Sequence, residues 1–185
     1  MLFSKGGGKY PKKTKKNKKR KTNTKKDSIV RKQFNHIFFH SMKDYLKEIS
    51  NNLISALEKD FFDLLIVNFA NPDMVGHTGN LSATKVAVET VDEMLGKICT
   101  CLDSVGGEAL IISDHGNCEQ MYIGDTENPH TYHTLNPVPC ILYSDREKVS
   151  ISSGSLVDIA PTILELLGKD KPKQMTGKSL LQWWH

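Results

Sequence analysis

Three short apolar runs constrain the fold of this 185-residue chain most strongly. They cover residues 63–69 (DLLIVNF), 109–113 (ALIIS) and 138–144 (VPCILYS), and polar or glycine-containing sequence bounds each of them. Continuous apolar runs of this length are typical of strands that are buried on both faces of a parallel sheet. We therefore expect these three segments to be strands of one sheet.

Segments with apolar residues at helical spacing alternate with the predicted strands. They cover residues 43–58, 81–103 and 155–167, and Gly168 would cap the last of these helices at its C-terminus. Helices that alternate with strands over short connections predict an α/β fold with a mostly parallel sheet.

Charge divides the chain into two unlike regions. Residues 1–32 carry 14 Lys or Arg and one acid, Asp27, whereas the remainder carries 11 basic and 20 acidic residues. A Lys-rich segment with almost nothing to bury cannot offset its own chain entropy. We therefore expect a disordered tail over residues 1–40 and a folded domain over residues 42–185. A basic tail would bind nucleic-acid phosphates nonspecifically, so a non-catalytic nucleic-acid-binding or scaffold protein is one alternative function.

The sequence also indicates a compartment. The four cysteines show no CxxC pair and no disulfide-rich density, which favours a reduced cytosol. No apolar run approaches the roughly 20 residues that a membrane span needs, and the basic N-terminus lacks the apolar stretch of a secretory signal. We therefore expect a cytoplasmic protein that does not associate with membranes.

Ionisable residues gather next to the predicted strands. They are Asp73 and His77 after the first strand, Asp114 and His115 after the second, and His130 and His133 before the third. Taken singly, each has a structural explanation, such as an Asp that caps the following helix and a His that packs beneath it. Together, they would meet at the edge of the sheet where ligands bind in α/β proteins. Carboxylate and imidazole ligands suit Mn²⁺ or Zn²⁺, so the pattern predicts the metal site of a hydrolase or phosphotransferase.

The segments around these residues resemble a known family. "NPDMVGHTG", "DHGN" and "HTLNPVP", followed by "LVDIAPTILELLG" and "MTGKSL", are similar to cofactor-independent phosphoglycerate mutase of the alkaline phosphatase superfamily. The resemblance covers residues 42–185. It implies a three-layer, alkaline-phosphatase-like fold and two divalent ions, usually Mn²⁺. It also implies the glycolytic interconversion of 3- and 2-phosphoglycerate through a phosphoserine intermediate.

The resemblance assigns ligands residue by residue. Asp73, His77 and His133 match the three protein ligands of one ion, and Asp114 and His115 match two ligands of the other. His130 matches none, because the family's ligand directly precedes "TLNPVP".

The nucleophilic serine, the remaining ligands of the second ion and the substrate-binding residues of the family have no counterpart here. Ser113 only precedes a ligand and does not match the nucleophile. We therefore expect a C-terminal fragment of the phosphatase domain that is inactive alone, which leaves its standing as an enzyme uncertain. Another metal-dependent phosphohydrolase of the superfamily is the alternative.

A fragment of this kind would lack strands of its own sheet. We expect it to leave a strand edge and apolar surface uncovered. The favoured explanation is a C-terminal product of a split or decayed gene. The alternatives are a chain that complements a separate N-terminal polypeptide, and a fragment retained as a metal-binding or interaction protein. "LFSKGGGKY" is loosely similar to the "FFxGGxE" stretch that precedes this region in the family. The Lys-rich tail that follows it would then be sequence that a frameshift has altered.

Overall fold

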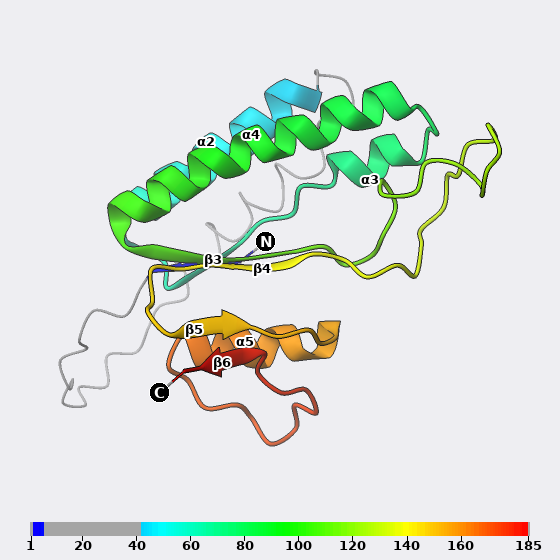
Figure 1. Cartoon of the computed structure of the whole chain (residues 1–185). Coiled ribbons are helices and arrows are strands. Elements are labelled where there is room, and N and C mark those ends of the chain that lie inside the picture. The colour runs from blue at the N-terminus through cyan, green and yellow to red at the C-terminus, as the bar shows by residue number, and fades with distance from the viewer. Residues whose placement is uncertain (1, 6–41, 185) are drawn as a thin grey trace, which may run out of the picture.

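The computed structural model describes residues 2–5 and 42–184, and every structural statement below refers to these ranges. In chain order, the elements are β1 (Leu2–Lys5), α2 (Met42–Glu58), β2 (Leu64–Ile66), α3 (Asn71–Gly76), α4 (Leu81–Val105), β3 (Gly107–Ile112), β4 (Cys140–Tyr143), β5 (Val149–Ile151), the 3₁₀ turn η1 (Leu156–Asp158), α5 (Ile159–Leu166) and β6 (Leu181–Trp183). Three layers result, as expected. Helices α2, α3 and α4 lie on one side of a four-stranded sheet, and α5 with the β5–β6 pair lies on the other (Figure 1).

The four-stranded sheet has the order β2-β1-β3-β4. Each neighbouring pair is antiparallel, with Leu2 opposite both Ile66 and Leu110, and Ala109 opposite Tyr143. The sequence predicts a mostly parallel sheet, but β2 and β3 run parallel only across the intervening β1. Strand β4 runs antiparallel to β3, and residues 113–139, which join the two strands, contain no helix of the kind that usually connects parallel strands.

Strand β1 lies in the range that the sequence predicts to be a disordered tail. Leu2 and Phe3 give this end of the chain an apolar character that the Lys-rich sequence after it lacks. Residues 2–5 form a central strand instead, paired with both β2 and β3. Residues 6–40 of the predicted tail lie outside the described residues, so their disorder and their contacts with nucleic acid remain predictions.

The predicted helices are present with small changes in their bounds. Asn80 caps α4, because its side-chain oxygen accepts a hydrogen bond from the Ala83 N–H at 3.0 Å. Gly106 ends α4 in the left-handed conformation with a φ of 64°. The predicted helix 155–167 divides into η1 and α5. Gly168, with a φ of 63°, ends α5 as expected. None of the helices in the described ranges combines the length and the apolar character that crossing a membrane requires.

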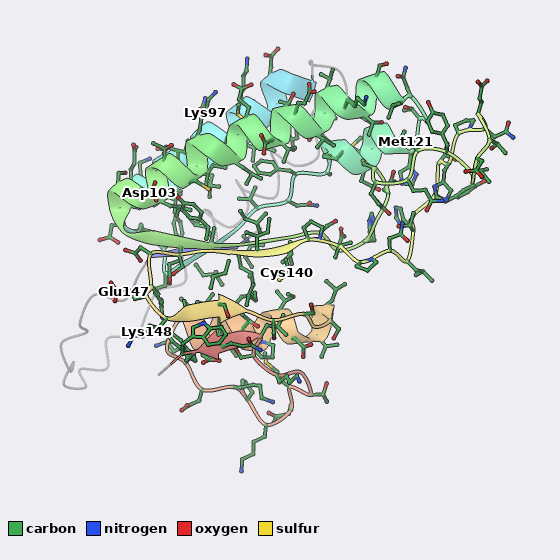
Figure 2. All side chains as sticks on the ribbon, viewed as in Figure 1. Lys97, Asp103, Met121, Cys140, Glu147 and Lys148 are labelled. Atoms are coloured by element: carbon green, nitrogen blue, oxygen red, sulfur yellow. The ribbon has the colours of Figure 1, made fainter. Side chains whose placement is uncertain are left out.

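The main core lies between the helices α2 and α4 and the sheet. Its buried members are Leu46, Leu53, Leu57, Phe69, Val91, Met94, Ile98, Cys101, Leu102 and Ala109. Charged side chains such as Lys97 and Asp103 project from α4 into solvent (Figure 2). At the two sheet edges, Ile66 on β2 is 70% exposed and Ile141 on β4 is 51% exposed. These exposed apolar side chains agree with the expectation of uncovered edges, and they show that β2 is an edge strand rather than one buried on both faces.

A buried ion pair joins the start of β3 to the turn after β4. Glu108 is 1% exposed, and its two carboxylate oxygens accept hydrogen bonds from Nε and Nη2 of Arg146, each at 2.6 Å. Ser144 donates a further hydrogen bond to the same carboxylate. Nη2 of Arg146 also donates to the Leu166 carbonyl at 3.0 Å, so the pair ties α5 to the sheet.

Candidate metal centre

Asp73 and His77 lie side by side because a short helix follows β2 directly. Asp73 is in the first turn of α3, and His77 is the C-cap residue of that helix, four positions later. Side chains four apart on a helix share one face, and here Asp73 Oδ1 lies 3.3 Å from His77 Nε2. Asp73 does not cap the helix that follows, because Asn80 does so.

His133 completes a three-residue cluster from a distant part of the sequence. Its Nε2 lies 3.1 Å from Asp73 Oδ1 and 3.1 Å from His77 Nε2. Ligand atoms about 2.1 Å from one ion, at angles of roughly 90–110°, lie about 3.0–3.4 Å apart. The three separations therefore match those of atoms that share one metal ion. The predicted ligand set Asp73, His77 and His133 is brought together within 4.8 Å.

A backbone carbonyl orients the His77 ring. The Thr131 carbonyl oxygen lies 2.7 Å from His77 Nδ1, and since a carbonyl can only accept, Nδ1 carries the proton. In the neutral ring, Nε2 then presents its lone pair toward Asp73 and His133. Hydrogen bonds of this kind commonly fix the tautomer of metal-binding histidines.

The buried side chain of Asn117 supports the Asp73 carboxylate. Its Nδ2 donates to Asp73 Oδ1 at 2.9 Å, and its side chain is buried at 5% exposure. A Cβ at Gly76 would collide with the Asn117 side-chain oxygen, so this close approach requires glycine.

The adjacent Cys118 donates to the Pro72 carbonyl at 3.0 Å. Burial, and then the charges of Asp73 and Glu119, raise the pKa of its thiol.

His115 lies against the same cluster, and Asp114 contacts His115 from a largely exposed position. The rings of His115 and His133 stack with centroids 3.6 Å apart, and His115 Nε2 lies 4.0 Å from Asp73 Oδ1. Asp114 Oδ1 is 3.6 Å from His115 Nε2, and its side chain is 79% exposed. In the described part of the chain, Asp114 and His115 gain no third ligand of their own.

His130 and Ser113 lie outside the three-residue cluster. His130 packs edge-on against Tyr132 with ring centroids 6.1 Å apart. The Ser113 hydroxyl donates to the His115 carbonyl at 2.7 Å, so it stabilises the turn after β3.

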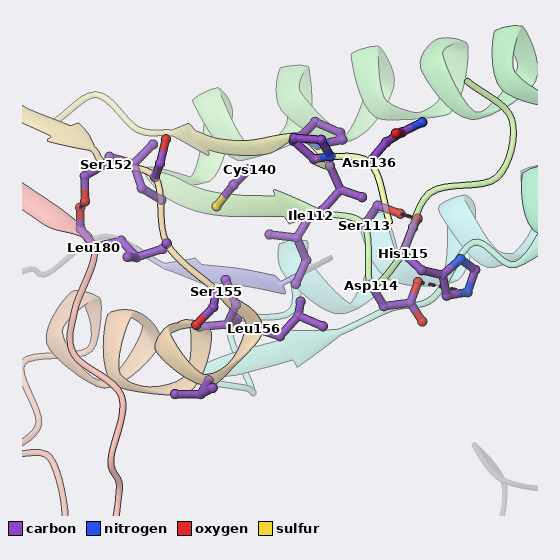
Figure 3. A pocket seen from close by; sticks show the side chains of 18 of the residues that line it. Ile112, Ser113, Asp114, His115, Asn136, Cys140, Ser152, Ser155, Leu156 and Leu180 are labelled. Carbon is purple, nitrogen blue, oxygen red and sulfur yellow. Dashed lines mark hydrogen bonds and ion pairs between the residues drawn. The ribbon is translucent and has the colours of Figure 1, made fainter. Parts of the chain in front are cut away.

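A pocket of about 710 Å³ opens beside Asp114. Figure 3 shows Ser113, Asp114 and His115 at one end and Ser152, Ser155 and Leu180 toward the other. Its wall includes several apolar side chains, among them Ile112, Val138, Leu156 and Val157. Leu135 at the rim is fully exposed, and Leu156 and Val157 are more than half exposed. The pocket thus joins the predicted ligands of the second ion to uncovered apolar surface.

Sequence reasoning did not assign Asn117 and the Thr131 carbonyl, which contact the cluster, or Glu119, which contacts Asn117. A backbone carbonyl has no sequence signal. The Asn of "DHGN" belongs to a segment that the resemblance identifies, but its contact with Asp73 depends on how two segments of the chain meet.

Burial alone would raise the pKa of Glu119, but hydrogen bonds from Thr134, Asn136 and backbone N–H groups outweigh it. The pKa is therefore lowered and the carboxylate is charged at neutral pH.

Comparisons with known proteins agree with this arrangement. A curated 2,3-bisphosphoglycerate-independent phosphoglycerate mutase of Coxiella burnetii is 48% identical over 134 residues, which cover 72% of this chain and 26% of that protein. The enzyme of the same name from Symbiobacterium thermophilum is 52% identical over 135 residues, again 72% of this chain and 26% of that protein. This chain thus spans about a quarter of the length of these relatives.

A solved structure and a family model extend the likeness. The crystal structure of Leishmania mexicana phosphoglycerate mutase at low cobalt concentration matches with a TM-score of 0.70 and 33% identity, over 75% of this chain and 28% of that chain. The expected resemblance to cofactor-independent phosphoglycerate mutases and the alkaline-phosphatase-like fold class are confirmed. The model of the metalloenzyme superfamily matches residues 40–171. From its sequence and its fold alike, this chain belongs to the metalloenzyme superfamily.

Proposed function

We propose that this chain supplies the metal-binding part of a cofactor-independent phosphoglycerate mutase and holds one divalent ion with Asp73, His77 and His133. The convergence of their three ligand atoms within 4.8 Å carries the proposal. A bound divalent ion would stabilise charge on a transferring phosphoryl group and lower the pKa of a hydroxyl nucleophile. A mixed carboxylate and imidazole set suits Mn²⁺ or Zn²⁺, and we favour Mn²⁺ because the family that the sequence resembles usually holds it. The substrates would be 3- and 2-phosphoglycerate, as the names of the relatives suggest.

The second ion would need groups from another polypeptide segment. Asp114 and His115 offer two ligands beside a pocket with exposed apolar side chains. A segment that filled this pocket would bury the apolar surface and bring further ligands close to Asp114. We propose that a separate N-terminal polypeptide, or the rest of a longer chain, supplies this segment and the nucleophilic serine. The described residues would then be inactive alone.

The same proposal fits a cytoplasmic protein. All four cysteines are unpaired, as expected in a reduced compartment, and phosphoglycerate is a substrate of glycolysis.

Calorimetric titration with Mn²⁺ tests the ligand assignment. We expect Asp73→Ala and His133→Ala to weaken Mn²⁺ binding at least tenfold, because each removes one of three direct ligands. His130→Ala is the matched control, since it removes a nearby imidazole that lies outside the cluster. Unchanged Mn²⁺ affinity in both ligand variants would refute the assignment.

An activity assay tests the role of the missing segment. The chain would be assayed with Mn²⁺ for interconversion of 3- and 2-phosphoglycerate, first alone and then with a separately expressed N-terminal polypeptide. We expect turnover only in the mixture. Turnover by the chain alone would contradict the proposed absence of the nucleophile. Hydrolysis without isomerisation in the mixture would instead identify a phosphohydrolase.

A further inference from the structure

Two loops bring the supporting groups of the metal centre together. The first loop, residues 113–119, follows β3 and contains His115 and Asn117, whose amide holds Asp73. The second loop, residues 131–136, precedes β4 and contains His133 as well as the carbonyl that orients His77. The position of His133 relative to Asp73 and His77 therefore depends on how these two loops are held against each other.

The Glu119 carboxylate joins the two loops. Its Oε2 accepts a hydrogen bond from the Asn117 backbone N–H at 2.6 Å, within the first loop. Its Oε1 accepts hydrogen bonds from the Thr134 hydroxyl and from Asn136 Nδ2, the latter at 3.0 Å, both in the second loop. One charged group thus satisfies three donors from two segments, and charge-assisted hydrogen bonds are the stronger kind.

The backbones of the two loops also meet beside Glu119. The Thr134 N–H donates to the Gly116 carbonyl at 2.9 Å, as in an antiparallel bridge. A Cβ at Gly116 would collide with the Thr134 hydroxyl and the Glu119 carboxylate, so glycine is what permits this approach. His133 directly precedes Thr134, and Asn117 directly follows Gly116. A shift of either loop would therefore move a ligand or its support.

We propose that Glu119 is a positioning residue of the metal centre, which presets the separation of His133 and Asp73 by tying the two loops together. The inference rests on the proposed function, because it assigns Glu119 a role in binding the same ion. Loops that are already ordered need not be ordered when the ion binds, and such preorganisation increases affinity. Glu119 itself touches none of the three ligand side chains, so it acts through Asn117 and Thr134.

Two substitutions and one control test the proposal with Mn²⁺ as the probe. Glu119→Ala removes all three acceptor contacts, and we expect about tenfold weaker Mn²⁺ binding in calorimetry, at the low end for groups that support metal ligands. Glu119→Gln keeps one oxygen acceptor and can hold only one of the two loops, so its affinity should be intermediate. Glu127→Ala removes an equal charge from the neighbouring exposed loop and should bind like the wild type.

Two further measurements separate positioning from a general effect on folding. Glu119 is exposed, so water replaces part of its contacts, and we expect Glu119→Ala to lower the urea unfolding midpoint of the metal-free chain only slightly. Amide hydrogen exchange of Thr134 and Asn117 in the metal-free chain should accelerate in Glu119→Ala but not in Glu127→Ala. A loss of Mn²⁺ affinity that only parallels a lowered unfolding midpoint would overturn the positioning role.

The outcomes also distinguish this proposal from the proposed function. If the wild type binds Mn²⁺ and Glu119→Ala binds it equally well, the positioning role of Glu119 is refuted while the metal centre stands. If the wild type itself binds no Mn²⁺, the proposed function fails, and with it the role of Glu119 at a metal centre. In that case, exchange of the Thr134 and Asn117 amides still reports whether Glu119 orders the two loops.

Discussion

Replacing Arg146 with Ala should destabilise the fold severely, because it would leave the buried Glu108 carboxylate without its cation. Glu108 is 1% exposed and receives two hydrogen bonds of 2.6 Å from Arg146. After the substitution, the Ser144 hydroxyl would be the one remaining donor to the carboxylate among the described residues. Removing one partner of a buried ion pair costs about 3–5 kcal/mol. The Arg146 side chain is 26% exposed, so water can enter its place, and we expect a loss near the lower limit, about 3 kcal/mol.

Urea unfolding followed by circular dichroism at pH 7 measures this loss. With a denaturant slope of roughly 1–3 kcal/mol per molar, the midpoint should fall by about 1–3 M. The exposed pair of Lys97 and Glu93, 2.9 Å apart on α4, gives a contrast in burial. Lys97→Ala should cost only about 0.3–0.5 kcal/mol, because solvent screens exposed pairs.

A double variant separates the unpaired charge from the lost contacts. Glu108→Gln combined with Arg146→Ala removes the buried charge together with its partner, so it should be less destabilising than Arg146→Ala alone. The reasoning is refuted if Arg146→Ala costs no more than Lys97→Ala. It is also refuted if the double variant is as unstable as the sum of the two single variants, since the charges would then not be coupled.

Two further predictions concern titration. The backbone N–H of Lys178, and then that of Ser155, donate hydrogen bonds to the Asp158 carboxylate and lower its pKa. Asp158 therefore stabilises the fold at pH values above its ordinary pKa of 3.8. This stability is lost as the pH falls through the lower pKa of the folded state. Asp158→Asn should therefore flatten the acid limb of a plot of unfolding free energy against pH, and an unchanged limb would contradict this. Tyr143 donates a hydrogen bond to Asp103 at 2.6 Å, and this bond raises the pKa of its phenol to about 12. Ultraviolet titration should show a late-ionising component that ionises earlier in Asp103→Asn, and an unshifted curve in that variant would argue against the assigned cause.

Local pattern was sufficient for most helices and strands. The apolar runs marked β2, β3 and β4, and helical spacing marked α2 and α4, because these segments bury one side or both against the core. Asp73, His77 and His133 could be grouped because residues that flank strands of one sheet meet at its edge. This inference needed the resemblance as well, since spacing alone left structural explanations open.

The pairing of strands was not predictable in the same way. Four residues before a Lys-rich segment carry too little pattern to reveal a central strand, and the partners of β1 lie more than 50 residues away. The direction of β4 depends on the path of residues 113–139, which hydrophobic periodicity does not encode. The contacts of Glu119 and of the Thr131 carbonyl join separate segments of the chain, and sequence pattern does not encode which loops meet.

The central position of β1 has a consequence for the order of events during synthesis. The ribosome makes β1 before either of its partners, and β3 follows about a hundred residues later. At roughly 5–20 residues per second, β1 would wait about 5–20 s before β3 exists to pair with it. The pairing of β1 with β3 thus joins strands that are about a hundred residues apart in the sequence, and such nonlocal contacts slow folding. Until it forms, β1 and β3 each have an open edge at which a chaperone or another nascent chain can bind.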